Sequence, residues 1–336
     1  MTHPALRTPL CDLLEIEAPI VQAGMGFVAR AELCGAVSAA GGLGVIGAAT
    51  LGPDELRDEI RAVREITDRP FGVDILFARP PRGAKSETAS PIREDVQALV
   101  EVVFDERVPV LASGLGDPGP FVERAHALGI TVMALVGNTR NALRVAASGV
   151  DVVVAQGYDG GGHTGRIGTL SLLPAVLDAV EVPVVAAGGI GDGRGLAAVL
   201  AMGAVGAWMG TRFVASFEAT GHEKYKRRIT EIDDEGTLRT RCFSGKPARM
   251  IRNPIAEAWE APELQAQIQP FPRQFGIMQR WLGEDPYTAG RIEGRIEIGA
   301  LAAGQSSAVI DEVLPVAQII ESVMAEAEAA LGRLTG

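Results

Sequence analysis

The chain has 336 residues; 47% of them are hydrophobic, 5% are aromatic, and 41 are glycines. This length suffices for one large or two modest domains. Its formal net charge is −11 at pH 7. Because no concentrated basic patch with interleaved aromatic residues offsets that charge, a nucleic-acid-binding role is not expected.

The cysteines and the apolar runs indicate the cellular compartment of the protein. Cys11, Cys34 and Cys242 lie far apart without a CxxC pair, which is typical of reduced thiols and not of a disulfide framework. Prolines interrupt any apolar segment near the first residues, and the longest uncharged run, 33–53, is too rich in glycine for a membrane span. We therefore expect a cytoplasmic protein with no signal peptide and no membrane partner.

Apolar runs and helix-forming segments alternate over the first 211 residues. We expect buried strands at 19–22, 43–46, 71–76, 108–111, 130–135, 152–155, 184–187 and 205–209. We expect helices at 31–40, 53–67, 92–104, 121–128, 138–147, 172–179 and 196–202, and a long mobile loop at 78–91. Eight β/α units with short loops favour a closed (β/α)8 TIM barrel over an open doubly wound sheet.

This alternation of strands and helices, and its end near residue 211, divide the chain into three parts. Residues 1–216 are expected to form the barrel. Residues 217–300, rich in charge, proline and scattered aromatics, are expected to form an irregular, partly helical insertion that covers its active-site end, with 223–228 as a solvated helix face. In the C-terminal segment 301–336, apolar residues at helical spacing predict a helix over 316–331 that packs back on the barrel.

The loop after the sixth strand combines glycines with a histidine. Four glycines (157, 160, 161 and 162) directly precede His163. Glycines there let the backbone adopt positive φ and approach a ligand closely, and a histidine can exchange a proton near neutral pH. The alternative is a structural histidine bonded to a loop carbonyl. The position of His163 after a barrel strand favours catalysis, whereas the scattered histidines form no metal-binding pair, so no metal is expected.

Two further loops indicate a phosphate site. Gly188-Gly189 and Gly210-Thr211 follow the seventh and eighth strands, where barrels of this kind often hold a phosphate on backbone N–H groups. The alternative is that these glycines only close tight turns. Gln156 and Asp74, at the ends of the sixth and third strands, are placed to orient a polar ligand, or to satisfy backbone groups and cap a loop.

Several stretches of the sequence resemble the nitronate monooxygenase (2-nitropropane dioxygenase-like) family. They are PIVQAGM (19–25), PFGVD (70–74), AQGYDGGGH (155–163), AGGIGDGRG (187–195), MGTRF (209–213) and AGQ (303–305) followed by ID (310–311). The resemblance covers nearly the whole chain in matching order. It implies a TIM barrel that binds FMN without covalent attachment.

The resemblance also assigns roles to residues. It places Gly24 and Met25 along the isoalloxazine, and His163 beside flavin N5 as base or polar partner of the substrate. The other implied cofactor contacts are Asp74, Gln156, Gly161, Gly162, Ala187, Gly188, Gly189, Gly210 and Thr211. The chain departs from the family at two positions: Asp74 replaces the usual Asn, and Leu135 replaces a polar or basic flavin contact of some relatives. Either change is expected to alter redox tuning or substrate choice.

The implied activity is FMN-dependent oxidoreduction, first as a nitronate monooxygenase that converts alkyl nitronates and O2 into a carbonyl compound and nitrite. The same motifs occur in NAD(P)H-dependent relatives that reduce quinones, enones or enoyl thioesters, which is the second expectation. A non-catalytic flavin-binding protein is the third. Besides the small-molecule substrate with O2 or NAD(P)H, a second copy of the chain is an expected partner, as a homodimer.

Overall fold

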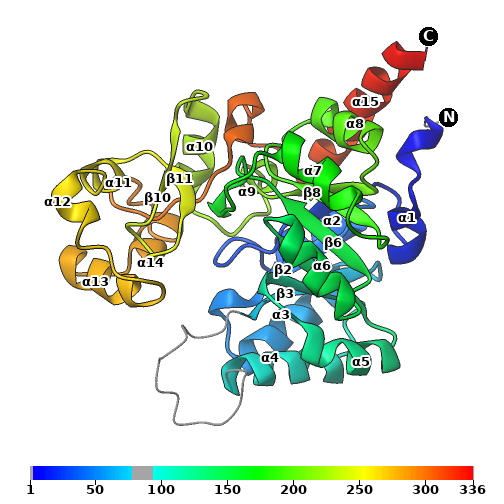
Figure 1. Ribbon diagram of the computed structural model, residues 1–336, viewed down its shortest axis with the longest axis horizontal. Coiled ribbons are helices and arrows are strands. Elements are labelled where there is room, and N and C mark those ends of the chain that lie inside the picture. The colour runs from blue at the N-terminus through cyan, green and yellow to red at the C-terminus, as the bar shows by residue number, and fades with distance from the viewer. Residues whose placement is uncertain (1–2, 78–93, 336) are drawn as a thin grey trace.

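The computed structural model describes residues 3–77 and 94–335. Its centre is a barrel of eight parallel strands, which Figure 1 shows from the side. From β2 onward each barrel strand pairs with the next one, and the last pairs with the first, whereas β1 and β2 meet only at an isolated bridge. The strands are β1 (Ile20–Gln22), β2 (Gly44–Gly47), β3 (Phe71–Phe77), β4 (Val110–Gly116), β5 (Thr131–Val136), β6 (Val152–Gln156), β8 (Val184–Ala187) and β9 (Gly206–Met209). All eight expected strands are present, and the closed (β/α)8 barrel is confirmed.

The seam between β1 and β2 closes the barrel with little backbone pairing. A single parallel bridge joins Val21 to Leu43. Beside it, the buried Gln22 side chain pairs with the backbone of β2. Its Nε2 donates to the Val45 carbonyl at 3.1 Å, and its Oε1 accepts from the Val45 N–H at 3.1 Å. The side-chain amide thus satisfies backbone groups that a wider ladder would otherwise pair.

Strand residues alternate between the barrel interior and the surrounding helices, as the pleat requires. On β6, Val152 and Val154 belong to the inner apolar cluster, whereas Val153 belongs to the outer one. Because Val73 and Ile75 of β3 both pack in the outer cluster, Asp74 between them points into the barrel. Burial on both faces explains the continuous β-branched runs of the sequence.

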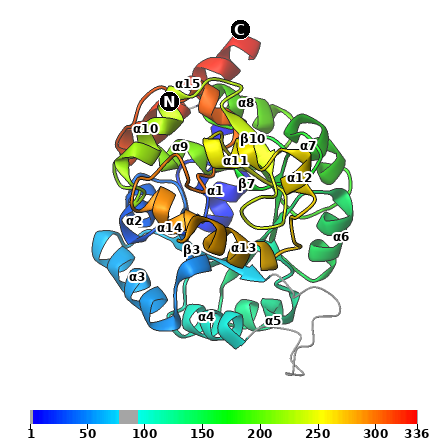
Figure 2. The ribbon, with the colours of Figure 1, turned by 90° about the vertical axis from the view of Figure 1, so that its left-hand side faces the viewer.

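A ring of helices surrounds the strands (Figure 2). They are α2 (Ala31–Ala39), α3 (Pro53–Ile66), α4 (Glu94–Asp105), α5 (Gly119–Ala127), α6 (Thr139–Ala147), α7 (Thr169–Leu177) and α8 (Gly193–Ala201). Local chemistry sets several starts: the Asn138 side chain caps α6 and Asp192 caps α8, as such residues commonly do. The expected loop at 78–91 lies outside the described residues.

The eighth helix position is filled from a distance. After β9 the chain forms only one short turn, α9 (Thr211–Val214). The space between α8 and α2 is taken by α15 (Val316–Thr335), which contacts both helices and corresponds to the helix expected at 316–331. A Cβ added at Gly193 of α8 would lie 2.2 Å from the Val323 carbonyl oxygen of α15, so the two helices meet backbone to backbone.

A short helix that was not predicted closes the end of the barrel that lies away from residues 223–291. The chain begins its described part with η1 (Pro4–Leu6) and α1 (Pro9–Leu14). Leu10, Cys11 and Leu14 of α1 join the inner apolar cluster, and α1 lies away from the yellow and orange elements in Figure 1. With only six residues, α1 is too short for its period to show in the sequence.

Residues 223–291, which we call the lid, lie over the other end of the barrel (Figure 2). The elements between α9 and α15 are α10 (Glu223–Glu231), β10 (Thr237–Thr240), β11 (Ala248–Ile251), α11 (Pro254–Ala258), α12 (Pro262–Gln265), α13 (Arg273–Leu282), α14 (Pro286–Arg291) and η3 (Gln305–Val309). The lid has its own apolar cluster around Phe243, Trp259 and Met278.

Two expectations about this region were wrong. The segment after β6 is not only a loop, because β7 (Gly162–His163) joins β10 and β11 in a three-stranded sheet. Residues 223–228 are not solvated throughout: Glu223, Lys224 and Arg227 are exposed, but Tyr225 and Lys226 are buried. The Tyr225 hydroxyl donates to the Ala302 carbonyl and Lys226 Nζ to the Phe217 carbonyl.

The described helices include none that is both long enough and apolar enough to cross a bilayer. All three cysteines are free and buried.

Candidate active site

A cavity of about 630 Å³ lies between the lid and the carboxyl ends of the barrel strands. Every site residue proposed from the sequence lines it: Gly24, Met25, Asp74, Gln156, Gly161, Gly162, His163, Ala187, Gly188, Gly189, Gly210 and Thr211. Leu135 lines it as well, and the lid contributes Ala248, Met250, Phe275, Gln279, Asp285, Tyr287 and Arg291. A concave site of this size, with a few polar groups on an apolar wall, suits a small molecule.

One side of the cavity presents unpaired backbone donors. The N–H groups of Gly188, Gly189, Gly210 and Thr211 donate no hydrogen bond to any residue in the described ranges. Gly188 and Gly189 adopt φ of +94° and +78°, which only glycine takes readily. Convergent backbone N–H groups bind anions, so these two loops fit the phosphate of a cofactor.

The start of α8, in contrast, is already occupied by carboxylates of the protein. The Gly195 N–H donates to Asp192 Oδ1 at 3.0 Å, and the Gly193 N–H donates to Glu326 Oε2 at 2.9 Å. A phosphate at this end of the barrel would therefore meet the loop donors and not the first turn of the helix.

Asp74 lies in a slot between two glycines. A Cβ at Gly24 would lie 2.3 Å from Asp74 Cβ, and one at Gly114 would lie 2.6 Å from Oδ2. The Gly114 N–H donates to Oδ1 at 2.5 Å, and no described lysine or arginine pairs with the carboxyl. Burial raises the pKa of Asp74 to about 8, against the opposing effect of that hydrogen bond.

The glycines of the loop after β6 have mainly structural partners, which corrects part of the sequence interpretation. Of the four, Gly162 alone has a positive φ, +69°. A Cβ at Gly157 would lie 2.1 Å from Thr169 Oγ1, and one at Gly161 would lie 2.8 Å from the Ala303 carbonyl carbon. Close packing of these chain segments, and not ligand approach alone, therefore requires the missing side chains. Gln156 still turns toward the cavity.

His163 is held by the lid and kept neutral. Its Nε2 lies 3.0 Å from Ser244 Oγ, with the donor set by the ring tautomer, and its ring meets Phe271 edge-on at 5.9 Å. Burial lowers the pKa of His163 to about 4, helped by the charges of Lys246 and Arg291. Nδ1 has no partner in the described part of the chain, so an uncharged imidazole has one ring nitrogen left for a ligand.

Tyr287 and Arg291 add a phenol and a cation to the same wall. Arg291 is 9% exposed and is fixed by hydrogen bonds to the carbonyls of Ala300 (2.9 Å) and Gly26 (3.1 Å). Its guanidinium lies 4.9 Å from the Tyr287 ring centroid, and it pairs with no carboxylate among the described residues. Burial raises the pKa of Tyr287, so the phenol keeps its proton at neutral pH.

Three further functional residues were not predicted from the sequence: Ser244, Tyr287 and Arg291. Each lies in the lid, whose fold depends on contacts with its own core and with β7. One signal was present: Asp285-Pro286 is a helix start, and Tyr287 and Arg291 follow at a spacing of four residues, which places them on one face. No group of three or more potential metal-binding side chains occurs within the described residues.

Comparison with known proteins agrees with this geometry. The family model described as nitronate monooxygenase matches residues 7–326. The (3aS,4S,5R,7aS)-5-hydroxy-7a-methyl-1-oxo-octahydro-1H-indene-4-carboxyl-CoA dehydrogenase of Mycobacterium tuberculosis is 36% identical, with 96% of each chain covered. FabK from Thermotoga maritima superposes with a TM-score of 0.86 at 38% identity, covering 98% of this chain and 99% of its own. The nitroalkane oxidase of Streptomyces ansochromogenes gives 0.83 at 33% identity, covering 97% and 99%.

The family model, the M. tuberculosis relative and the Streptomyces structure are named for oxidation or dehydrogenation reactions, so the chain is an enzyme, a flavin-type oxidoreductase, and the non-catalytic alternative is set aside. The match spans the barrel, the lid and most of α15, and it includes the loops that line the cavity. The chain belongs to the nitronate monooxygenase family.

Proposed function

We propose that the protein is an FMN-dependent oxidoreductase that holds its substrate against the cofactor with His163. The observation that carries this proposal is the convergence, in one cavity, of unpaired backbone donors suited to a phosphate and a neutral histidine. FMN supplies a reversible electron acceptor that also carries a phosphate. Gly188, Gly189, Gly210 and Thr211 would hold that phosphate, and Gly24 and Met25 would border the ring system.

The first candidate reaction is oxidation of an alkyl nitronate by O2 to a carbonyl compound and nitrite. A nitronate is an anion, and Arg291 offers it a positive charge that no described carboxylate neutralises. The free ring nitrogen of neutral His163 can accept a proton from the carbon of a nitroalkane, or can receive a hydrogen bond from a protonated substrate. The family match and the nitroalkane oxidase relative support this candidate.

The second candidate is NAD(P)H-dependent reduction of an enone, enoyl thioester or quinone. It is supported by the relative named as a carboxyl-CoA dehydrogenase. In this reaction the protonated phenol of Tyr287 can donate a hydrogen bond to the acceptor carbonyl, while Arg291 stabilises the negative charge that develops on it.

Anaerobic stopped-flow absorbance separates the two candidates. The FMN-loaded protein is mixed in turn with propyl nitronate, NADH and NADPH, and the oxidised-flavin band is followed. Rapid loss of that band with nitronate alone would establish the first candidate. Rapid loss with a nicotinamide alone would establish the second. A colourless protein that takes up no FMN on soaking would contradict the proposal as a whole.

The role of His163 has its own test. His163→Gln keeps an uncharged polar side chain and should retain FMN, while the rate of flavin reduction falls by about 10²–10⁴-fold. Ser244→Ala frees the imidazole ring that Ser244 orients, so we expect a smaller fall in the rate of flavin reduction. Unchanged rates in His163→Gln, with FMN bound, would exclude His163 from catalysis.

A further inference from the structure

Two arginines lie on the face of the small sheet that points away from the cavity, and the charge of a third acts on one of them. Along β11, Ala248 and Met250 line the cavity, so Arg249 between them points to the other face. Arg239 of β10 is directly opposite Arg249 in the ladder and lies on that same face. With Arg166, whose charge acts on Arg239, these residues form what we call the arginine cluster.

The cluster is built around the ring of Tyr158. The Arg249 guanidinium lies 4.6 Å from the ring centroid and that of Arg239 lies 5.4 Å from it. Arg249 is buried and fully engaged: Nη2 donates to the Tyr158 carbonyl at 3.2 Å, and Nη1 to Thr237 Oγ1 at 3.2 Å. Arg249 is thus a fixed charge behind the other two.

Arg239 and Arg166 keep donors available. Arg239 is fixed by one bond, from Nε to Thr164 Oγ1 at 3.2 Å, while its two terminal nitrogens reach no acceptor within the described ranges. Arg166 is exposed and forms neither a hydrogen bond nor an ion pair with the described residues. Arg239 is held in place with its terminal nitrogens free, and a free guanidinium fork of this kind can bind a phosphate bidentately.

The cluster lacks a neutralising partner. Burial lowers the pKa of Arg239, and the nearby charges of Arg166 and Arg249 lower it further, while the Tyr158 phenol alone acts in the opposite direction. No described carboxylate contributes. Like charges held close together without an acidic neighbour repel one another, and a bound anion would relieve that repulsion.

We propose that the arginine cluster binds the phosphate groups of a nucleotide-bearing substrate, the chemistry that coenzyme A thioesters and NAD(P)H share. The inference rests on the second candidate reaction above. Thr164, which holds Arg239, directly follows His163, and Arg249 directly follows Ala248, the partner of His163 in the sheet. A long, flexible substrate bound at the cluster would pass around the β7 edge of the sheet and place its reactive end in the cavity.

Isothermal titration calorimetry on the FMN-loaded protein tests the binding directly. The probes are coenzyme A, NADPH and inorganic pyrophosphate, each at low and high salt. We expect Arg239→Gln and the exposed Arg166→Gln to weaken binding of at least one nucleotide by 10-fold or more, and the wild-type affinity to fall with salt. Arg280→Gln removes an exposed lid arginine outside the cluster and controls for the change in net charge.

Kinetics then identify the source of the phosphate. If the acceptor uses the cluster, Arg239→Gln raises KM for crotonyl-CoA without changing kcat, and leaves the N-acetylcysteamine thioester, which has no phosphate, unaffected. If the nicotinamide uses it, KM rises for NADPH or NADH instead. Propyl nitronate carries no phosphate, so its oxidation, where present, should be unchanged in both cases.

The contrary outcome is equally clear. The proposal would be overturned if the Arg239→Gln and Arg166→Gln variants bound every probe as tightly as the Arg280→Gln variant. Because calorimetry does not depend on turnover, a protein that binds coenzyme A through the cluster but reduces no thioester would contradict the proposed reaction and not the site.

Discussion

At the scale of single residues, backbone packing sets the charge of Asp74. The carboxyl is buried between Gly24 and Gly114, and no described lysine or arginine pairs with it. A protonated carboxyl both donates and accepts hydrogen bonds, as does the side-chain amide of the Asn that the sequence resemblance implies at this position. The replacement therefore preserves the hydrogen-bonding pattern below about pH 8 and loses it above.

This interpretation predicts a change of stability with pH. The pKa of Asp74 rises from 3.8 to about 8 on folding, so between these values the folded state binds more protons and stability falls as pH rises. Asp74→Asn removes this penalty. We expect its Tm relative to wild type to rise progressively from pH 4.5 to pH 8, by the equivalent of about 2–5 kcal/mol. A difference that does not vary with pH would contradict a raised pKa.

Gln22 gives a second prediction at this scale. Gln22→Leu keeps the volume roughly but leaves the N–H and C=O of Val45 without partners at the barrel seam. Each unpaired buried group costs about 1–3 kcal/mol, so urea denaturation should show a loss of about 2–4 kcal/mol. Gln267→Leu, at an exposed amide, should change stability by less than about 0.5 kcal/mol.

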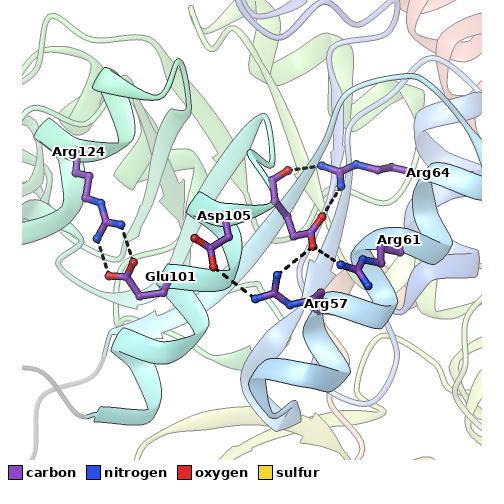
Figure 3. A network of polar contacts seen from close by, with 7 residues as sticks. Arg57, Arg61, Arg64, Glu101, Asp105 and Arg124 are labelled. Carbon is purple, nitrogen blue, oxygen red and sulfur yellow. Dashed lines mark hydrogen bonds and ion pairs between the residues drawn. The ribbon is translucent and has the colours of Figure 1, made fainter.

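At the scale of elements, ion pairs connect the outer helices (Figure 3). Arg57, Arg61 and Arg64 share one face of α3 and all contact Glu106, directly after α4, at 3.2, 3.2 and 2.7 Å. Arg124 of α5 pairs with Glu101 of α4 at 2.6 Å. Burial acts to raise the pKa of Glu106, but hydrogen bonds and charges of Arg64 and Arg61 outweigh it and hold that pKa below its usual range.

Removing the shared carboxylate should be costly. The Glu106 side chain is 11% exposed, and Glu106→Gln leaves three cations facing one another, so we expect a loss of about 1–3 kcal/mol that shrinks at high salt. Asp12→Asn is the control, because the Arg7–Asp12 pair is 69% and 67% exposed and should contribute little. Equal losses in the two variants would show that the network adds nothing.

The elements differ in how far the sequence determines them. Barrel strands such as β6 are recognisable because Val152, Val153 and Val154 are buried on both faces. The sheet β10–β11–β7 was missed because its pairing joins segments about 85 residues apart and β7 has only two residues. The same reason hides Ser244, whose contact with His163 exists only once that sheet forms.

At the scale of the whole molecule, residues near the barrel strands were found and those of the lid were not. The barrel fixes where each strand ends, so Asp74, Gln156 and Gly210 could be placed from strand order alone. Tyr287 and Arg291 reach the cavity through the packing of the lid core, which no local pattern encodes. The arginine cluster likewise depends on strand pairing between β10 and β11.

The contact between α8 and α15 completes the barrel wall and gives a prediction at this scale. Gly193→Ala would bring a methyl group within 2.2 Å of the Val323 carbonyl oxygen and 2.4 Å of the Ala327 nitrogen, and overpacking of this kind costs about 1–3 kcal/mol. At Gly332, also in α15, an added Cβ meets nothing within 4 Å, so Gly332→Ala should be neutral or stabilising by up to about 1 kcal/mol. Thermal denaturation of both variants compares the two.

The late position of α15 in the sequence also bears on the order of synthesis. A ribosome makes the chain from its N-terminus, so all eight strands and the lid emerge before the helix that fills the gap between α8 and α2. The lid carries its own apolar cluster and can fold while that gap is open. We expect nascent chains stalled before Val316 to contain every cavity residue and yet to capture flavin poorly, so that cofactor loading follows the docking of α15 between α8 and α2.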